Sequence, residues 1–340
     1  MTRIANDNSD KTAPRAPDDD VIQPFQLELS GLRGRVVRLG AVLNDLLSAH
    51  EYPRAVAHLL AETVATALLL SSMLKYEGIF TLQTSSDGPV RTLVVDVTTL
   101  GAIRGYASYD ADVIKAMELA EERTTSGPYA GFELKQILGK GYLAFTVDQG
   151  EFTERYQGIV SLAGDALVDS VRHYFDQSEQ IGTSLKVAAA FDEASGWRAG
   201  AIMLQRMPDP SIAAIPEENI APFRPELAAE KEEEWSRSNV LLQSITDLEL
   251  VNPLLHSHDI LFRLFHEEGV RIFPPQTVYK KCRCSTERVS RVMATLPPDD
   301  QEHAATNGII EMTCEFCSKS YHYNINDMTC TVVEPDQKKH

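Results

Sequence analysis

The feature that most constrains this chain is the position of its cysteines. All five lie at or after position 282 of a 340-residue sequence, and the first 281 residues contain none. The disulfide framework of a small secreted domain would spread an even number of cysteines along the chain, whereas clustering in a large chain indicates metal binding or thiol chemistry. We therefore expect the chemistry of this protein near its C-terminus.

Four of the cysteines form two close pairs, Cys282 with Cys284 and Cys314 with Cys317, separated by 29 residues. Four thiolates, each about 2.3 Å from the metal, complete a tetrahedral zinc site. Apolar residues alternate on both sides of the second pair, which predicts two strands with this pair at the hairpin turn. The alternating residues are Ile310, Met312, Tyr321, Tyr323 and Ile325.

On spacing alone, a purely structural zinc site is the leading interpretation. The alternative is a redox site, because an oxidant can join ligand thiolates as disulfides and so eject the metal. A thioredoxin-like site is disfavoured, since only 23 residues follow Cys317 and no parallel-strand pattern surrounds the pair. A zinc hydrolase is disfavoured because four cysteine ligands leave no position for water, and the His-Glu-x-x-His motif is absent.

Three other side chains near the cluster stay outside the predicted site. Cys330 is the fifth thiol, and a single remaining cysteine is more often a small buried hydrophobe. His303 and His322 are interpreted as surface imidazoles, because four cysteines already complete the ligand set.

Net charge, hydropathy and missing motifs argue against several classes of partner and location. The formal net charge of −17 repels phosphate backbones and argues against nucleic acid. The longest apolar stretch, 55–74, is interrupted by His58 and Glu62, so we predict no membrane span. No Walker loop is present, which predicts no nucleotide site, and the polar N-terminus matches no signal or transit peptide. These features predict a cytoplasmic protein.

The order of predicted elements indicates an α+β fold. A long helix from Pro53 to about Leu74, with apolar residues at helical spacing, precedes clustered strand patterns, which predicts an N-terminal α/β-layered domain with a largely antiparallel sheet. A helical linker and a small C-terminal zinc-binding domain follow. The predicted boundaries are a disordered tail at 1–22, a core domain at 23–208, a linker at 209–250, a zinc-binding domain at 251–330 and a tail at 331–340.

The predicted linker is acidic and carries few apolar anchors. Leu227, Trp235, Leu241 and Leu242 are the residues in it that favour contact with a partner surface. Such a segment is expected to be marginally stable.

Segments along most of the chain, together with the cysteine pattern, resemble the heat-shock protein 33 family of redox-regulated chaperones. The similar segments are Leu32-Arg33-Gly34, Leu74-Lys75-Tyr76-Glu77-Gly78, Asp87-Gly88-Pro89, Arg104-Gly105, Glu154-Arg155-Tyr156-Gln157-Gly158 and Leu264-Phe265-His266-Glu267-Glu268. The resemblance covers about residues 25–327.

This resemblance implies an ATP-independent holdase rather than an enzyme. It implies that the reduced, zinc-bound form is inactive, and that oxidation forms disulfides, releases zinc and unfolds the C-terminal domain and linker. Unfolding client proteins would then be bound, by a form that is commonly a homodimer. The implied disulfides are Cys282 to Cys284 and Cys314 to Cys317. The first is geometrically demanding, because residues two apart in an extended chain lie near the upper Cα separation of about 6.8 Å.

Overall fold

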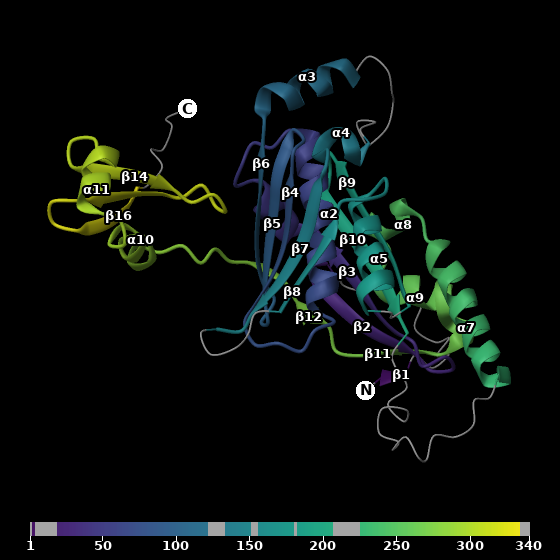
Figure 1. Cartoon of the computed structure of the whole chain (residues 1–340). Coiled ribbons are helices and arrows are strands. Elements are labelled where there is room, and N and C mark those ends of the chain that lie inside the picture. Colours follow the sequence, from purple (N-terminus) through teal and green to yellow (C-terminus); the bar gives the residue numbers. More distant parts are fainter. Residues whose placement is uncertain are drawn as a thin grey trace.

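The computed structural model describes residues 2–3, 19–121, 133–150, 156–179, 182–206 and 225–333. In this part of the chain, two large sheets enclose a central helix, and a small three-stranded sheet lies beside them near the C-terminus (Figure 1). The α+β fold class is therefore confirmed, and the predicted antiparallel sheet is in fact two sheets.

The first large sheet combines strands from both ends of the chain. Its order is β1-β11-β2-β3-β10-β9, with β12 also paired to β2, and all of its pairings are antiparallel. The strands are β1 (Thr2–Arg3), β2 (Val21–Leu27), β3 (Arg33–Leu39), β9 (Thr183–Asp192), β10 (Gly196–Gln205), β11 (Val270–Ile272) and β12 (Gln276–Thr277).

The second large sheet has the order β13-β6-β5-β4-β7-β8. Only the short pairing of β13 with β6 is parallel. The strands are β4 (Ile79–Ser86), β5 (Val90–Thr98), β6 (Ala102–Tyr109), β7 (Gly141–Asp148), β8 (Tyr156–Ser161) and β13 (Tyr279–Lys280).

Helix α2 (Arg54–Ser71) lies between the two sheets (Figure 1) and confirms the predicted long helix, which ends at Ser71. Every residue of α2 except Arg54 is buried, as expected for a helix that is apolar on all sides. It is long and apolar enough to cross a membrane, but 94% of that window is buried inside the fold. Two of its buried polar side chains, His58 and Glu62, lie one turn apart with 3.4 Å between Nε2 and Oε1. Helix α2 is therefore buried in the way that is typical of a core helix.

In the described residues, the remaining α-helices have 5 to 11 residues, except α7, which has 19. They are α1 (Ala41–Leu47), α3 (Ala111–Glu121), α4 (Leu134–Leu138), α5 (Leu167–Tyr174), α7 (Pro225–Gln243), α8 (Asp247–Val251), α9 (Ser257–Phe265), α10 (Thr286–Met293) and α11 (Pro298–Ala304). A π-helical turn (Phe175–Glu179) follows α5, and a 3-10 turn (His266–Glu268) follows α9.

Helices α7, α8 and α9 pack on the first sheet and form a second apolar core there. Leu242 is fully buried in this core, and Trp235 and Leu241 are half-buried against it. Most described residues of α7 before Ser238 are exposed. The side chain of Leu227 and residues 209–224 of the predicted linker lie outside what the structure describes. The described part of α7 is therefore held by few apolar contacts.

Two buried arginines of the first sheet form hydrogen bonds with backbone carbonyls at the carboxyl end of α8. Arg38 donates to the Asn252 carbonyl at 2.6 Å, and Arg198 donates to the Val251 carbonyl at 2.7 Å. Asp19 pairs with Arg198 at 2.5 Å and lies 3.6 Å from the Arg38 guanidinium. The described residues 251–278, assigned from the sequence to the C-terminal domain, thus pack with the N-terminal sheets.

The last residues of the segment expected as a tail, 19–22, take part in this fold. Asp20 accepts hydrogen bonds from the backbone N–H groups of Gly40 and Val42 at the start of α1. Val21 begins β2, and Ile22 is buried. Residues 1 and 4–18 lie outside the described residues.

Residues 270–280 form a strap that crosses from the first sheet to the second. It pairs with β2 through β11 and β12 and then with β6 through β13. These three strands have three, two and two residues, so each is held by only a few backbone hydrogen bonds. The strap connects α9 to the cysteine-bearing segment.

Replacing Arg237 with glutamine should loosen α7. Arg237 Nε donates to Glu268 Oε1 at 2.7 Å, and the Glu268 side chain is only 3% exposed. Removing one partner of an ion pair leaves the buried charge without compensation. We expect amide hydrogen exchange in residues 229–243 to accelerate about fivefold to tenfold. Exchange in α2 should stay unchanged, and R237K, which keeps the charge, should restore most of the protection. Equal exchange in R237Q and the wild type would contradict this role.

Candidate metal centre

The structure brings the four predicted cysteines together from two loops. Cys282 and Cys284 lie in the extended segment between β13 and α10, where Ser285 caps α10 by accepting from the Arg288 N–H. Cys314 and Cys317 lie in the turn between β14 (Ile309–Thr313) and β15 (Ser320–Asn324), as the alternation of apolar residues predicted. Strand β16 (Thr329–Val333) completes this small sheet.

Backbone hydrogen bonds shape the turn that carries the second pair. Cys314 donates its N–H to the Lys319 carbonyl at 2.9 Å, and Ser318 donates to the Cys314 carbonyl at 2.8 Å. Ser318 has a φ of 55°, a left-handed conformation that is uncommon for a residue with a Cβ. The turn therefore directs both thiols to the same side.

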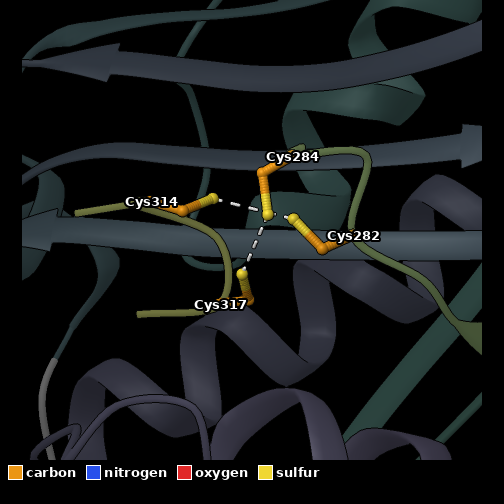
Figure 2. A group of neighbouring side chains, drawn as sticks. All are labelled: Cys282, Cys284, Cys314 and Cys317. Atoms are coloured by element: carbon orange, nitrogen blue, oxygen red, sulfur yellow. Dashed lines mark hydrogen bonds between the residues drawn. The ribbon is translucent and has the colours of Figure 1, made fainter. Parts of the chain in front are cut away.

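The four sulfur atoms converge on one point, as Figure 2 shows. All of them lie within 4.8 Å of one another, with 3.6 Å between Cys282 and Cys314 and 3.4 Å between Cys284 and Cys317. Sulfurs around a tetrahedral zinc ion, each about 2.3 Å from it, are about 3.8 Å apart. All five cysteines of the chain are free thiols, and the four in the cluster are half-buried. The donor set and its spacing fit a zinc ion.

Three thiols of the cluster have shifted pKa values. Burial raises the pKa of Cys282, but the Cys284 backbone N–H and the neighbouring thiols outweigh it and lower the pKa to about 7. Burial is the main cause that raises the pKa values of Cys314 and Cys317 above the ordinary thiol value, and interactions with neighbouring thiols of the cluster contribute. Zinc binds thiolates, so a bound zinc ion would replace the protons on these thiols.

The small sheet and α10 enclose an apolar core of only five buried side chains. They are Val289, Met293, Ile310, Tyr321 and Tyr323. Cys284 and Cys314 pack against this core. We call residues 281–333 the cysteine module.

Cys330 lies outside the cluster, on β16 opposite Tyr323, and packs against the same core. Burial raises the pKa of its thiol. His303 is exposed, with its Nδ1 2.7 Å from the Asp299 carbonyl oxygen, and His322 is half-buried on β15. Neither imidazole belongs to the described group of metal-ligating side chains.

The cysteine module contacts the second large sheet through residues that the sequence did not single out. Arg283, which stands between the first two cysteines, pairs with Asp96 on β5. Phe316, between the second two, lies over the Arg104 guanidinium with 3.7 Å from Cζ to the ring centroid. Ser318 Oγ donates to the Ala49 carbonyl at 2.7 Å. Both metal-binding loops therefore touch the N-terminal fold directly.

Comparison with known proteins decides the family. A family model described as Hsp33 protein matches residues 20–324. The chain belongs to the Hsp33 family. It is 36% identical over 314 residues to the 33 kDa chaperonin of Caulobacter vibrioides strain NA1000, covering 90% of this chain and 96% of that protein. The 33 kDa chaperonin of Pseudomonas fluorescens strain SBW25 is 33% identical over 314 residues, with 92% and 93% covered.

The fold agrees with a solved structure. The crystal structure of the 33 kDa chaperonin (heat shock protein 33 homolog) from Thermotoga maritima matches with a TM-score of 0.69 at 18% identity. The match covers 91% of this chain and 96% of that chain. The resemblance stated from the sequence is thus confirmed, and membership of the Hsp33 family makes this chain one of the chaperones.

Proposed function

We propose that this Hsp33 chain is a redox-regulated, ATP-independent holdase, and that Cys282, Cys284, Cys314 and Cys317 hold one zinc ion in its reduced, inactive form. The observation that carries the proposal is the convergence of four free thiols in a module with a very small apolar core. It acts in the cytoplasm on unfolding proteins and is not an enzyme. Its oxidised form is a homodimer, and it needs no nucleotide, nucleic acid or membrane.

The zinc ion supplies the stability that the cysteine module lacks. Ordering the backbone of a small domain has a large entropic cost, and domains with a small apolar core commonly need a metal or disulfides to fold. Five buried side chains therefore cannot hold residues 281–333 together. Structural zinc binding contributes about 10–16 kcal/mol in small zinc-dependent folds. The metal acts as a removable clamp.

A peroxide removes this clamp by oxidising the thiols. Each pair of zinc-bound thiolates loses two electrons to form one disulfide, and one hydrogen peroxide takes up these two electrons and two protons from the solvent to become two waters. Two peroxides thus convert four thiols into two disulfides. A disulfide sulfur no longer carries the negative charge that binds the cation, so the zinc ion is released.

Loss of the cysteine module propagates to α7 through the strap. The module continues directly into β13, β12 and β11, which are held by few hydrogen bonds. Glu268 lies two residues before the strap and holds α7 through its ion pair with Arg237. When the strap leaves the sheets, α7 loses this anchor and the apolar core beneath it becomes exposed. We propose that the switch comprises residues 281–333, the strap and α7.

Release requires disulfides within each loop. In the reduced cluster, sulfurs of different loops lie in contact, at 3.6 Å for Cys282 with Cys314 and 3.4 Å for Cys284 with Cys317. Disulfides between the loops would link the two metal-binding loops covalently and keep the module together. The disulfides Cys282–Cys284 and Cys314–Cys317 leave the two loops free to separate. We expect peptide mapping by mass spectrometry after peroxide treatment to find the pairs within the loops. A majority of cross-loop disulfides in the active form would contradict this mechanism.

The proposed function is tested by measuring zinc, thiols and aggregation in the same samples. Reduced chain is treated with hydrogen peroxide at mildly raised temperature. We expect loss of one zinc ion and four free thiols per chain, together with newly gained suppression of light scattering by a thermally unfolding protein. Retention of zinc, or zinc loss without suppression of aggregation, would show that the metal site is only structural.

A further inference from the structure

The outer face of the second large sheet, turned away from α2, carries a seat for an aromatic side chain. Alternation along the strands places Phe80, Leu82, Val95 and Ile103 toward the core. Thr81, Asp96 and Arg104 are register partners on the opposite, outer face. The Phe316 ring of the cysteine module lies on this face.

Two residues of β6 form the seat. The Arg104 guanidinium lies 3.7 Å from the Phe316 ring centroid, and the Tyr106 ring meets Phe316 edge-on, at 4.9 Å between centroids and 77° between planes. Guanidinium–ring and edge-to-face contacts both select an aromatic partner. The seat thus recognises a ring rather than general apolar surface.

The seat is held in place by its own sheet. Arg104 Nε and its terminal nitrogen each lie 2.7 Å from Asp96 Oδ2, and Thr81 Oγ1 donates to Asp96 Oδ1 at 2.6 Å. The Asp96 side chain is 6% exposed. All these groups belong to β4, β5 and β6, so they remain in position when the cysteine module departs.

The edge of β6 beside the seat already binds an extended segment. Tyr279 donates its N–H to the Gly101 carbonyl at 3.0 Å, and Lys281 donates to the Ile103 carbonyl at 2.9 Å. The strap covers only Ala102 and Ile103 of this strand. Its departure would leave an edge able to pair with another extended chain.

We infer that the edge of β6 and the Arg104–Tyr106 seat together bind an extended client segment that presents an aromatic side chain. In the reduced protein, residues 279–281 occupy the edge and Phe316 occupies the seat, so the chain itself blocks this site. The inference rests on the proposed function, because oxidation is what removes both occupants. The net charge of −17 disfavours an acidic or nucleic-acid ligand and favours neutral or basic segments.

A labelled peptide tests the seat. The probe is a fluorescein-labelled peptide of glycine, serine and threonine with one central phenylalanine, and its matched control has alanine at that place. Fluorescence anisotropy gives both dissociation constants for the full chain, reduced with zinc and oxidised. We expect the oxidised chain to bind the phenylalanine peptide at least tenfold more tightly than the alanine peptide, and the reduced chain to show no such preference.

Three variants and one control variant locate the site. In the oxidised chain, Y106A and R104K should weaken the phenylalanine peptide about tenfold and leave the alanine peptide unchanged, because lysine keeps the charge but not the planar stacking group. Tyr142 lies on β7 in the same sheet and is 45% exposed, so Y142A is the matched control and should bind as the wild type. In the reduced chain, F316A frees the seat while residues 279–281 still occupy the edge of β6, so its expected gain of about tenfold in affinity for the phenylalanine peptide measures the seat alone; its zinc content should stay at one ion per chain.

The outcomes separate this inference from the proposed function. If oxidation releases zinc and produces holdase activity, but Y106A and R104K bind both peptides as the wild type does, the seat is wrong and the proposed function stands. If oxidation produces no holdase activity, the proposed function fails, and the zinc-bound F316A variant still decides whether Phe316 blocks an aromatic site. Equal binding of the two peptides by F316A would overturn the inference.

Discussion

Replacing Cys284 with serine is expected to abolish zinc binding and to unfold the cysteine module, while the two large sheets keep their stability. The serine hydroxyl is not ionised at neutral pH and is a poor zinc ligand, so the closed four-sulfur site is lost. The five buried side chains that remain cannot offset the entropy of ordering the module. Zinc content per chain and hydrogen exchange in residues 281–333 measure the effect, which should be a complete loss of protection there.

The matched control for C284S is C330S. Cys330 is a half-buried thiol that packs against the same small core but lies outside the sulfur cluster. C330S should keep one zinc ion per chain and a protected module. A C284S variant whose module stayed protected from exchange would show that the metal is dispensable for folding.

Replacing Asp19 with asparagine is expected to destabilise the N-terminal fold by about 3 kcal/mol, the lower end of the cost of breaking a buried ion pair. Asp19 is the carboxylate between two buried guanidiniums, whose side chains are 2% exposed at Arg38 and 9% exposed at Arg198. Asparagine has no charge, so two buried positive charges would lie close together without it. The loss is measured by urea unfolding monitored through the fluorescence of Trp197 and Trp235. The midpoint urea concentration should fall, and the dependence of the unfolding free energy on urea concentration should stay unchanged.

The control for D19N is D45N. Asp45 lies in α1 and is exposed, so its replacement should change stability by less than about 0.5 kcal/mol. If D19N unfolds at the same urea concentration as D45N, the carboxylate does not organise the two arginines.

The cysteine site could be predicted from the sequence because its determinants are local. Alternation of Ile310 and Met312 before the turn, and of Tyr321 and Tyr323 after it, is enough to place Cys314 and Cys317 in a hairpin turn. Pairing with a second cysteine loop then follows from the ligand number of zinc. The long helix α2 was equally visible, because its apolar residues recur at helical spacing.

Features that depend on contacts between distant segments could not be predicted in this way. Strand periodicity shows that strands exist but not how they are divided between sheets, so two sheets looked like one. Asp19 looked like part of a polar tail, because its partners Arg38 and Arg198 lie far along the chain. The docking of Arg283 on Asp96 and of Phe316 on Arg104 carries no local pattern at all.

We propose that the zinc cluster clamps both the cysteine module and α7, and that losing it creates the chaperone. Zinc release, hydrogen exchange in residues 229–243 and 281–333, and suppression of aggregation can be followed together during peroxide treatment. We predict that zinc leaves, that both segments lose protection while α2 keeps it, and that holdase activity rises over the same interval. Release of zinc while residues 229–243 stay protected and aggregation proceeds unchecked would contradict the claim.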